Sequence, residues 1–575
     1  MAALLLLLSV LFYYASIDYD YDLWFHLKYG EQYMQDRTWH IDHTQFSWTP
    51  VDTGWKYVTW IGSSLLYIVY QAGSVTGLYI MMWLILFLVS GLVLSYAKAI
   101  GSAPDIRHVA GLMLVAAVMA PTVTIIKPEL FTILFFSFAV FVYFYSRSGR
   151  KNLFPVYPVL FLIWVNTHGG FIFGLFFITL TLCGELFSYF LTKKEALPKS
   201  LLQCFGITVI LSYLATLANP HGISYHAALF HYLTSDEYIG LAAHLQAYSD
   251  LWQVLFPKIH AFRPMISAWS MLTMLAFFLL AFIQECRKQR HFEFSLLITN
   301  LTFFFIGMGR ARASIFFPLL WVFSMVFLLK KSCPDDCGKR SQATVLLLVM
   351  CLSGIFFSYY AAYSSRSWFG SRMEEFIPAK EVMFIKNNKL PGPVFNDYLT
   401  GGYMIWTMHP DYKVFIDPRY GPYVNTVLPV WLRIRSDLTP ENLKRFSSAY
   451  PFRTALIGLE EIEIISWLLK SPDWKLAYFD KAAVVIVHRT VFDAMNPDSL
   501  RLDLGTGRFR GIANPRVLLQ LFNLYINLRT EYAREMMDIY RENVSDFYRF
   551  KEETVFRMGQ HLHHTELQLQ QHGRP

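Results

Sequence analysis

Acidic residues and a histidine follow the first apolar run of the chain directly. Asp20, Asp22 and His26 come just after an apolar run at residues 2–17 and stand among many Trp, Tyr and Phe. Carboxylates at this place can take a proton from a hydroxyl group or hold a divalent cation such as Mg²⁺ or Mn²⁺. The alternative is an interfacial belt, in which aromatic residues anchor the chain and the acids are only solvated. Residue types and spacing leave both interpretations open.

A second group of polar residues stands at the ends of later apolar runs. Ionisable residues at membrane depth are costly and therefore indicate function, although a lone Arg or Lys can also extend its side chain to the interface. In the topology derived below, all of these residues fall on the outer side together with the first loop. Such a group suits an anionic lipid-phosphate head group, with Arg and Lys on the phosphate. Its members are Lys127, Glu129, Asn166, His168, Asn219, His221, Arg310 and Arg312.

Long apolar runs must position these residues. Only 16% of the 575 residues are charged and the mean hydropathy is +0.34, which excludes a one-piece cytosolic enzyme. A membrane span needs about 20 apolar residues. The candidate runs are 2–17, 76–97, 108–126, 130–146, 154–168, 170–191, 201–218, 264–284, 294–309, 313–329 and 342–362.

The basic residues decide the topology. Fifteen Lys and Arg lie in five short connections, and basic connections mark the inner side of the membrane. These five fall at every second connection only if the shorter run 58–72 lies in the interface instead of crossing. The prediction is eleven spans with the N-terminus inside. The first run lacks a basic start and a clear cleavage site, so we expect it to be a retained span. Much of the net charge of +8 comes from these inner connections, so it does not indicate nucleic acid as a partner.

The chain after residue 362 has an ordinary soluble composition. Short apolar stretches at VFN, KVFID, TALIGL, KLAYF and AVVIVHR read as buried strands between helical stretches at 378–388 and 460–471. We therefore predict a membrane domain over 1–362, with outer loops at 18–57 and 219–263, and an extracytoplasmic α/β domain over 363–490. A helical extension covers 491–575.

Several motifs together resemble a known family. DYDLWFHLKYG (Asp20–Gly30), FSWT (Phe46–Thr49), WVNTHGG, ANPHG, VFNDYLTGGYMIW (Val394–Trp406) and KVFIDPRYGPY (Lys413–Tyr423) are similar to motifs of bacterial membrane proteins related to the GT-C glycosyltransferases. The matches extend from about residue 18 to 490. Asp42, Gln45 and Thr59 depart from the pattern of that group.

The resemblance implies a GT-C-like fold, a location in the bacterial inner membrane and transfer of a sugar from a polyprenyl-phosphate-linked donor. The acceptor would be a glycan, a lipid or a protein. Asp20 or Asp22 would be the base or a cation ligand, as acidic residues after the first span are in that family. The basic residues, and with them His26, would bind the donor.

Two residues of the outer domain have two interpretations. Asp417 and Arg419 follow a predicted buried strand, which is the usual place for site residues in α/β sheets. Alternatively they form an internal ion pair that holds the turn.

Two other functions stay open. A flippase or transporter for a lipid-linked saccharide would need polar residues deep in several spans, and a scaffold protein would use the outer domain to bind partners. No Walker, GxSxG or GxGxxG motif occurs.

Overall fold

The computed structural model describes residues 16–17, 20–102, 115, 125–191, 197–235, 238, 251–254, 262–289, 292–332, 370–371, 373–496, 502–546, 548 and 550–572. The predicted spans 2–17, 108–126 and 342–362 lie largely outside these residues. The described residues form two compact units. Unit 1 contains Tyr29–His40 and the described part of Lys56–Ile355, and unit 2 contains Ser16–Lys28, Ile41–Trp55 and the described part of Phe356–Pro575.

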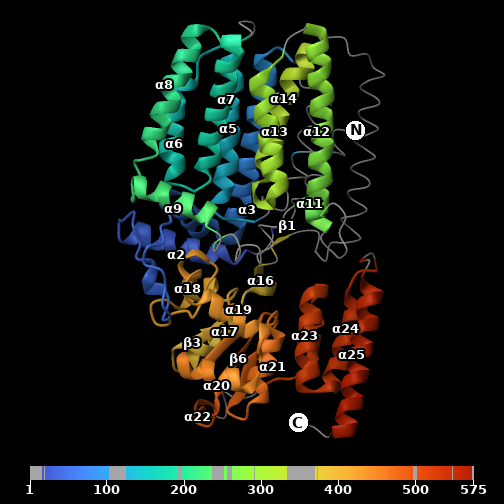
Figure 1. Cartoon of the computed structure of the whole chain (residues 1–575). Coiled ribbons are helices and arrows are strands. Elements are labelled where there is room, and N and C mark those ends of the chain that lie inside the picture. Colours follow the sequence, from blue (N-terminus) through green and yellow to red (C-terminus); the bar gives the residue numbers. More distant parts are fainter. Residues whose placement is uncertain are drawn as a thin grey trace. The chain divides into compact units, whose positions relative to one another are not determined.

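Unit 1 consists of long apolar helices. Its centre is α5 (Glu129–Arg147), which packs against α3, α7 and α14. Phe136 of α5 contacts the rings of Phe177, Phe303 and Phe316 at centroid distances of 5.6, 5.4 and 4.8 Å, so one aromatic cluster joins four helices. The other elements are α3 (Trp60–Ala99), η2 (Phe154–Val156), α6 (Tyr157–Val165), α7 (Phe171–Leu191), α8 (Lys199–Ala215), α9 (Ile223–Thr234), α11 (Leu251–Val254), α12 (Phe262–Gln289), α13 (Phe294–Gly309), η4 (Ala311–Ala313) and α14 (Phe316–Ser332) (Figure 1).

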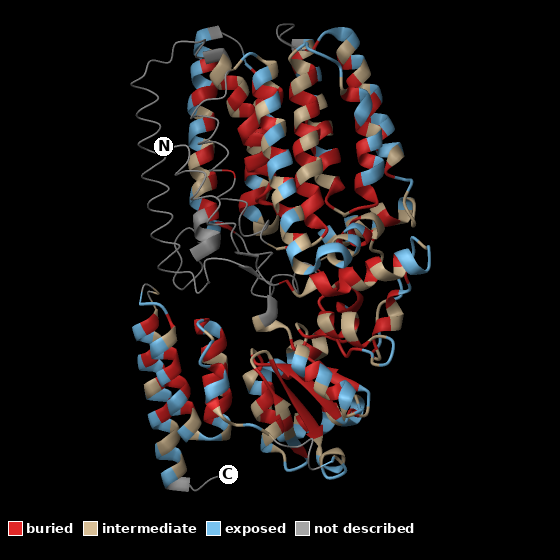
Figure 2. Ribbon diagram, turned by 180° about the vertical axis from the view of Figure 1, so that it is seen from behind, coloured by how far each residue is buried: buried red, intermediate tan, exposed pale blue. Residues whose placement is uncertain are grey.

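Five of the described helices are long and apolar enough to cross a membrane. They are Trp60–Ala99, Glu129–Arg147, Phe171–Phe190, Ser267–Lys288 and Ala311–Lys330, and three apolar helices are shorter. These helices fit a multi-pass membrane protein and coincide with predicted runs, while the count of eleven stays a prediction. Pale-blue exposed positions lie on the outside of unit 1 and red buried positions inside, as expected for helices that face lipid on one side (Figure 2).

A sharp bend divides α3. Gly73 and Ser74 have non-helical backbone angles, and Ser74 has a φ of 51°. The stretch 60–72 is therefore a separate helix from 75–99, as the sequence predicts for 58–72. Its location in the membrane interface stays a prediction.

Unit 2 is built on a four-stranded sheet in the order β3 (Val394–Asn396), β4 (Thr454–Gly458), β6 (Ala483–His488), β5 (Trp474–Phe479). β3 and β4 are parallel, and the other pairs are antiparallel. Every residue of β4 is buried, so both faces of the sheet are covered. The helices around it are α17 (Ala379–Asn387), α18 (Gly401–Met408), α19 (Leu428–Ser436), α20 (Pro440–Ala449) and α21 (Ile462–Lys470).

One predicted strand is wrong. Lys413–Asp417 forms no strand, because a side chain takes the place of a backbone partner on one flank: Asn396 Oδ1 accepts from Phe415 N at 2.7 Å and Asn396 Nδ2 donates to Ile416 O at 2.8 Å. On the other flank, Val414 N donates to Phe46 O at 2.9 Å and Trp48 N donates to Val414 O at 3.0 Å. The first loop thus adds a short extended segment beside the α/β fold.

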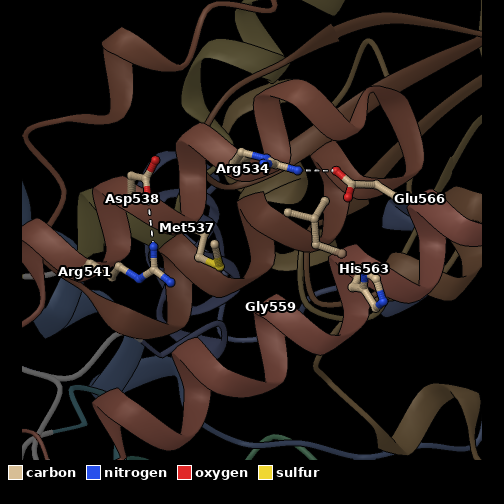
Figure 3. A pocket seen from close by; sticks show the side chains of 8 residues that line it. Arg534, Met537, Asp538, Arg541, Gly559, His563 and Glu566 are labelled. Atoms are coloured by element: carbon tan, nitrogen blue, oxygen red, sulfur yellow. Dashed lines mark hydrogen bonds and ion pairs between the residues drawn. The ribbon is translucent and has the colours of Figure 1, made fainter.

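The C-terminal stretch contains the helices α23 (Pro515–Leu528), α24 (Thr530–Asn543) and α25 (Lys551–His572), while its status as a separate extension stays a prediction. A shallow polar groove lies between α24 and α25, where Arg534 pairs with Glu566 at 2.7 Å and Arg541 with Asp538 at 3.0 Å (Figure 3). The remaining short elements of the described chain are β1 (Ser16–Ile17), α2 (Asp22–Gln35), η1 (His43–Phe46), β2 (Gly370–Ser371), α16 (Met373–Phe376), η5 (Gly421–Tyr423), α22 (Arg489–Phe492) and η7 (Thr506–Phe509).

Candidate functional site

A carboxylate at the start of α5 gathers cationic groups from distant parts of unit 1. Glu129 is only 8% exposed, and its Oε1 accepts from Arg312 Nε and Nη2. Lys127 Nζ lies 3.5 Å from Glu129 Oε2, and His168 Nε2 lies 3.9 Å from Glu129 Oε1. The first turn of a helix favours a negative charge, so α5 itself supports an ionised Glu129. Four of the predicted binding residues are thus brought together.

The short connection between α13 and α14 supplies two guanidinium groups. Gly309 ends α13, Arg310 is in an extended conformation, and Arg312 lies in η4. Both arginines are part-exposed, with 36% of the Arg312 side chain accessible. Lys127 and Arg312 together place two positive charges at one carboxylate, a composition that favours an anionic ligand, while a role of Arg310 beside them stays a prediction.

The WVNTHGG motif holds His168 against α5. Trp164 Nε1 donates to Thr132 Oγ1 at 3.1 Å, Thr132 Oγ1 lies 2.9 Å from His168 Nδ1, and Gly170 N donates to the same Nδ1 at 3.1 Å. A Cβ atom at Gly170 would lie 2.6 Å from Thr132 Oγ1, so only glycine allows this close approach. The motif therefore fixes the orientation of the imidazole.

Asn166, Asn219 and His221 have contacts of their own. Asn166 accepts from Trp60 Nε1 at 2.8 Å and donates to Ala218 O at 2.8 Å, which ties α3 and the end of α8 to the motif. Asn219 donates to Thr216 O and Gly222 O and accepts from His221 N at 2.9 Å, so it shapes the ANPHG turn. The His221 ring lies 5.3 Å from that of His40. These contacts do not include Glu129, and the role of the three residues in binding stays a prediction.

The two predicted catalytic acids belong to unit 2 and stand at the start of α2. Asp20 Oδ1 accepts from Asp22 N at 2.7 Å, so Asp20 caps this helix. Asp20 is only 8% exposed and His26 is 1% exposed. The structure thus gives Asp20 a structural role, and its catalytic role stays a prediction.

The Gly401–Gly402–Tyr403 motif holds this segment in place. A Cβ atom on Gly402 would lie 2.3 Å from Tyr21 O, and Trp24 packs edge-on against Tyr403 at 4.9 Å. Asp397 caps the turn into α18 by accepting from Leu399 N at 2.8 Å and Thr400 N at 3.1 Å. Asp397 thus stabilises the start of α18, and Gly401 and Gly402 allow close packing.

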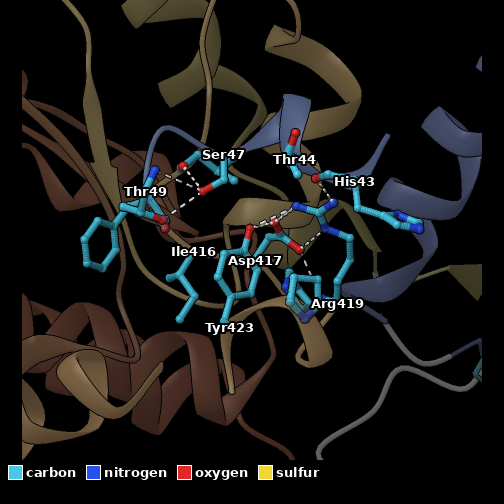
Figure 4. A network of polar contacts seen from close by, with 12 residues as sticks. His43, Thr44, Ser47, Thr49, Ile416, Asp417, Arg419 and Tyr423 are labelled. Atoms are coloured by element: carbon cyan, nitrogen blue, oxygen red, sulfur yellow. Dashed lines mark hydrogen bonds and ion pairs between the residues drawn. The ribbon is translucent and has the colours of Figure 1, made fainter. Parts of the chain in front are cut away.

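Asp417 and Arg419 form a fully buried ion pair (Figure 4). Arg419 Nε and Nη2 each lie 2.7 Å from a different oxygen of Asp417, and Tyr423 Oη donates to the same carboxylate. Arg419 Nη1 donates to His43 O at 2.8 Å and the guanidinium stacks over Phe46 at 5.1 Å. This geometry matches the internal pair considered from the sequence, and it fastens the first loop to unit 2.

The FSWT motif makes the same junction. Ser47 Oγ donates to Val414 O at 3.0 Å and Thr49 Oγ1 donates to Phe415 O at 2.6 Å, so side-chain hydroxyls satisfy carbonyls that a strand partner would otherwise bind. Asp42 caps η1 through Thr44 N at 2.9 Å.

A second ion network lies at the other end of α5. Arg147 Nη1 donates to Glu185 Oε1 at 2.7 Å, Arg147 Nη2 pairs with Glu293, and Ser295 Oγ donates to Glu185 at 2.9 Å. Sequence reasoning missed this network. Glu185 is an acid inside the apolar run 170–191, and this sequence feature could have indicated the network.

Among the described residues, no group of three or more His, Cys, Asp or Glu is arranged to hold a metal ion. A divalent cation at Asp20 and Asp22 therefore stays a prediction from the sequence.

No protein-family model and no curated protein matches the chain. Solved structures similar to it include ArnT from Cupriavidus metallidurans bound to undecaprenyl phosphate, with a TM-score of 0.34, and the apo state of the same protein, with a TM-score of 0.37. Each alignment has 11% identity and covers 84% of this chain and 96% of the other. At these TM-scores the similarity by itself establishes neither the fold nor an activity of this chain.

Proposed function

We propose that the chain is a membrane glycosyltransferase that moves a sugar from a polyprenyl-phosphate-linked donor to an acceptor at the extracytoplasmic face of the bacterial inner membrane. The observation that carries the proposal is the convergence of Lys127 and Arg312 on Glu129, beside His168. These groups come from three separate connections of unit 1 and form a cationic site. The family resemblance of the motifs supports the same function.

The chemistry assigns separate tasks to the two groups of residues. The acceptor oxygen attacks the anomeric carbon, and the bond from that carbon to the phosphate oxygen breaks. Negative charge then develops on the leaving polyprenyl phosphate, where Lys127, Arg310 and Arg312 stabilise it. The carboxylate of Asp20 or Asp22 takes the proton of the acceptor hydroxyl, or holds a divalent cation in its place.

The test is release of polyprenyl phosphate by the purified full-length protein in lipid nanodiscs, incubated with polyprenyl-phosphate hexoses and pentoses and a panel of glycan, lipid and peptide acceptors. We expect acceptor-dependent release from one donor. Saturable binding without release would instead support the non-catalytic alternative, and movement of intact donor across liposome membranes would support the flippase.

A further inference from the structure

The hydrogen bonds around His168 determine which ring nitrogen carries its proton. Gly170 N can only donate, and it donates to His168 Nδ1 at 3.1 Å. Trp164 Nε1 can also only donate, and its acceptor is Thr132 Oγ1 at 3.1 Å. Because Nδ1 already accepts from Gly170 N, the hydroxyl hydrogen of Thr132 points to His168 Nδ1, at 2.9 Å. Nδ1 accepts from both sides, so the proton is on Nε2.

The same contacts oppose a charged imidazole. An imidazolium carries a hydrogen on Nδ1, which would then face the N–H of Gly170 and break the hydrogen bond from that group. Lys127 and Arg312 lie around the same carboxylate and repel a third positive charge, whereas Glu129 attracts it. Burial of the ring, the two cations and the N–H of Gly170 together outweigh the single carboxylate.

The outer nitrogen of the ring remains available to a ligand. Nε2 lies 3.9 Å from Glu129 Oε1, which is longer than a hydrogen bond. The Nε2–H group sits beside Lys127 and Arg312, the groups to which we assign the phosphate.

We infer that His168 is a neutral hydrogen-bond donor that orients one phosphate oxygen of the lipid-linked ligand through Nε2–H, while Lys127 and Arg312 supply the charge. This inference rests on the proposed function for the identity of the ligand. It makes Thr132 and Gly170 positioning residues, since they keep the proton on Nε2. Binding of a phosphodiester is then independent of pH between 5.5 and 7.5.

The experiment compares two substitutions at one position. His168→Gln keeps a neutral N–H donor at nearly the same reach and cannot take up a proton, whereas His168→Leu has no donor. The probe is farnesyl methyl phosphate, whose diester phosphate keeps one charge over this pH range, unlike a monoester with a pKa near 6. Its dissociation constant is measured at pH 5.5, 6.5 and 7.5 with the full-length protein in nanodiscs. His561→Gln on α25 is the matched control, and thermal unfolding checks that each variant folds.

We expect the wild type and His168→Gln to agree within about threefold at every pH, and His168→Leu to bind roughly tenfold more weakly, as for one hydrogen bond to a charged group. Two results would overturn the inference: a wild-type affinity that rises as the pH falls while that of His168→Gln does not, or a Gln variant as weak as the Leu variant.

A separate measurement distinguishes failure of the inference from failure of the proposed function. If Arg312→Gln leaves the affinity for the probe unchanged, the phosphate site is wrong. The position of the proton can then still be measured. The ¹⁵N spectrum of histidine-labelled wild type, minus that of His168→Gln, contains only the signals of His168. A protonated Nε2 and a bare Nδ1 at both pH 7.5 and 5.5 support the inference, and a second protonated nitrogen at pH 5.5 contradicts it.

Discussion

Arg312 and Glu129 form an ion pair across 183 positions of the sequence, and the pair joins the connection between α13 and α14 to the first turn of α5. The carboxylate of Glu129 keeps the guanidinium of Arg312 in place. It also accepts from the same N–H groups that an anionic ligand would bind. Glu129 is therefore both the support of the cationic site and the competitor of its ligand.

This double role predicts opposite effects of two substitutions. Arg312→Gln removes a charged donor, so the affinity for a polyprenyl phosphodiester should fall roughly tenfold or more. Glu129→Gln releases Arg312 and Lys127 from their common carboxylate, so the affinity should rise, by roughly threefold to tenfold. Titration of both variants in nanodiscs checks this. A weaker Glu129→Gln protein with an unchanged melting temperature would show that Glu129 contacts the ligand itself.

The acids of the first loop allow chemistry to be separated from helix capping. Asn caps a helix about as well as Asp, so Asp20→Asn should leave thermal stability nearly unchanged. If Asp20 is the base, the same variant should lose roughly 100-fold or more of the transfer rate. Asp22→Asn is the matched change two residues away. Full activity of the double variant at normal membrane levels would exclude both acids as the base.

The buried pair of Asp417 and Arg419 should be essential for attachment of the first loop. Replacing Asp417 with Asn leaves the guanidinium buried without its counter-charge, which costs about 3–5 kcal/mol. Arg419→Lys should not restore stability, because an ammonium cannot bond both carboxylate oxygens and His43 O together. Limited proteolysis within residues 41–55 measures the loss. Exposed Arg534→Lys serves as the control and should leave the cleavage rate unchanged.

A buried acid in α17 should make the α/β fold less stable at higher pH. Burial raises the pKa of Glu381 to about 7, and its Oε1 accepts from Ala483 N at 3.1 Å. The unfolded chain loses this proton near pH 4.5, whereas the folded chain keeps it to about pH 7. The stability is therefore complete below pH 4.5, falls between pH 4.5 and 7, and is lower by about 3 kcal/mol above that window.

Hydrogen exchange of β6 in the full-length protein measures this effect. Opening should become more frequent between pH 5 and 8, after correction for intrinsic exchange rates. Glu381→Gln has a neutral side chain at every pH. The part of the pH dependence of β6 opening that comes from residue 381 should therefore be absent in this variant. Burial also raises the pKa of Glu461 to about 7, so a smaller dependence should persist in this variant. If opening of β6 changes with pH as steeply in Glu381→Gln as in the wild type, the pH dependence does not come from Glu381.

Patterns carried by consecutive residues were predictable from the sequence. Apolar runs gave the described long helices, and the apolar stretches at Val394, Thr454, Trp474 and Ala483 gave the four strands. Lys413–Asp417 has the same local pattern and is not a strand, because its partners are a side chain, Asn396, and a loop from the other end of the sequence. Local patterning cannot reveal that kind of partner.

The site was predictable only in its ionisable members. Lys127, Glu129, His168 and Arg312 stood out as polar residues at the ends of apolar runs, and they do meet. Thr132 orients His168, yet it lies within a run of apolar residues and has no distinguishing neighbour. Thr132 lies three residues after Glu129 and is therefore on the same face of α5. This position in the helix brings it to His168.

The division of the first loop between two units has a consequence for biosynthesis. Ile41–Trp55 belongs to unit 2, and its partners Val414 and Arg419 lie about 370 residues later in the chain. At about 5–20 residues per second, a ribosome needs roughly 20–70 seconds to reach them. During that interval the carbonyl groups of Phe46 and His43 have no final partner. The nascent N-terminal segment must therefore wait for the last third of the polypeptide to be made.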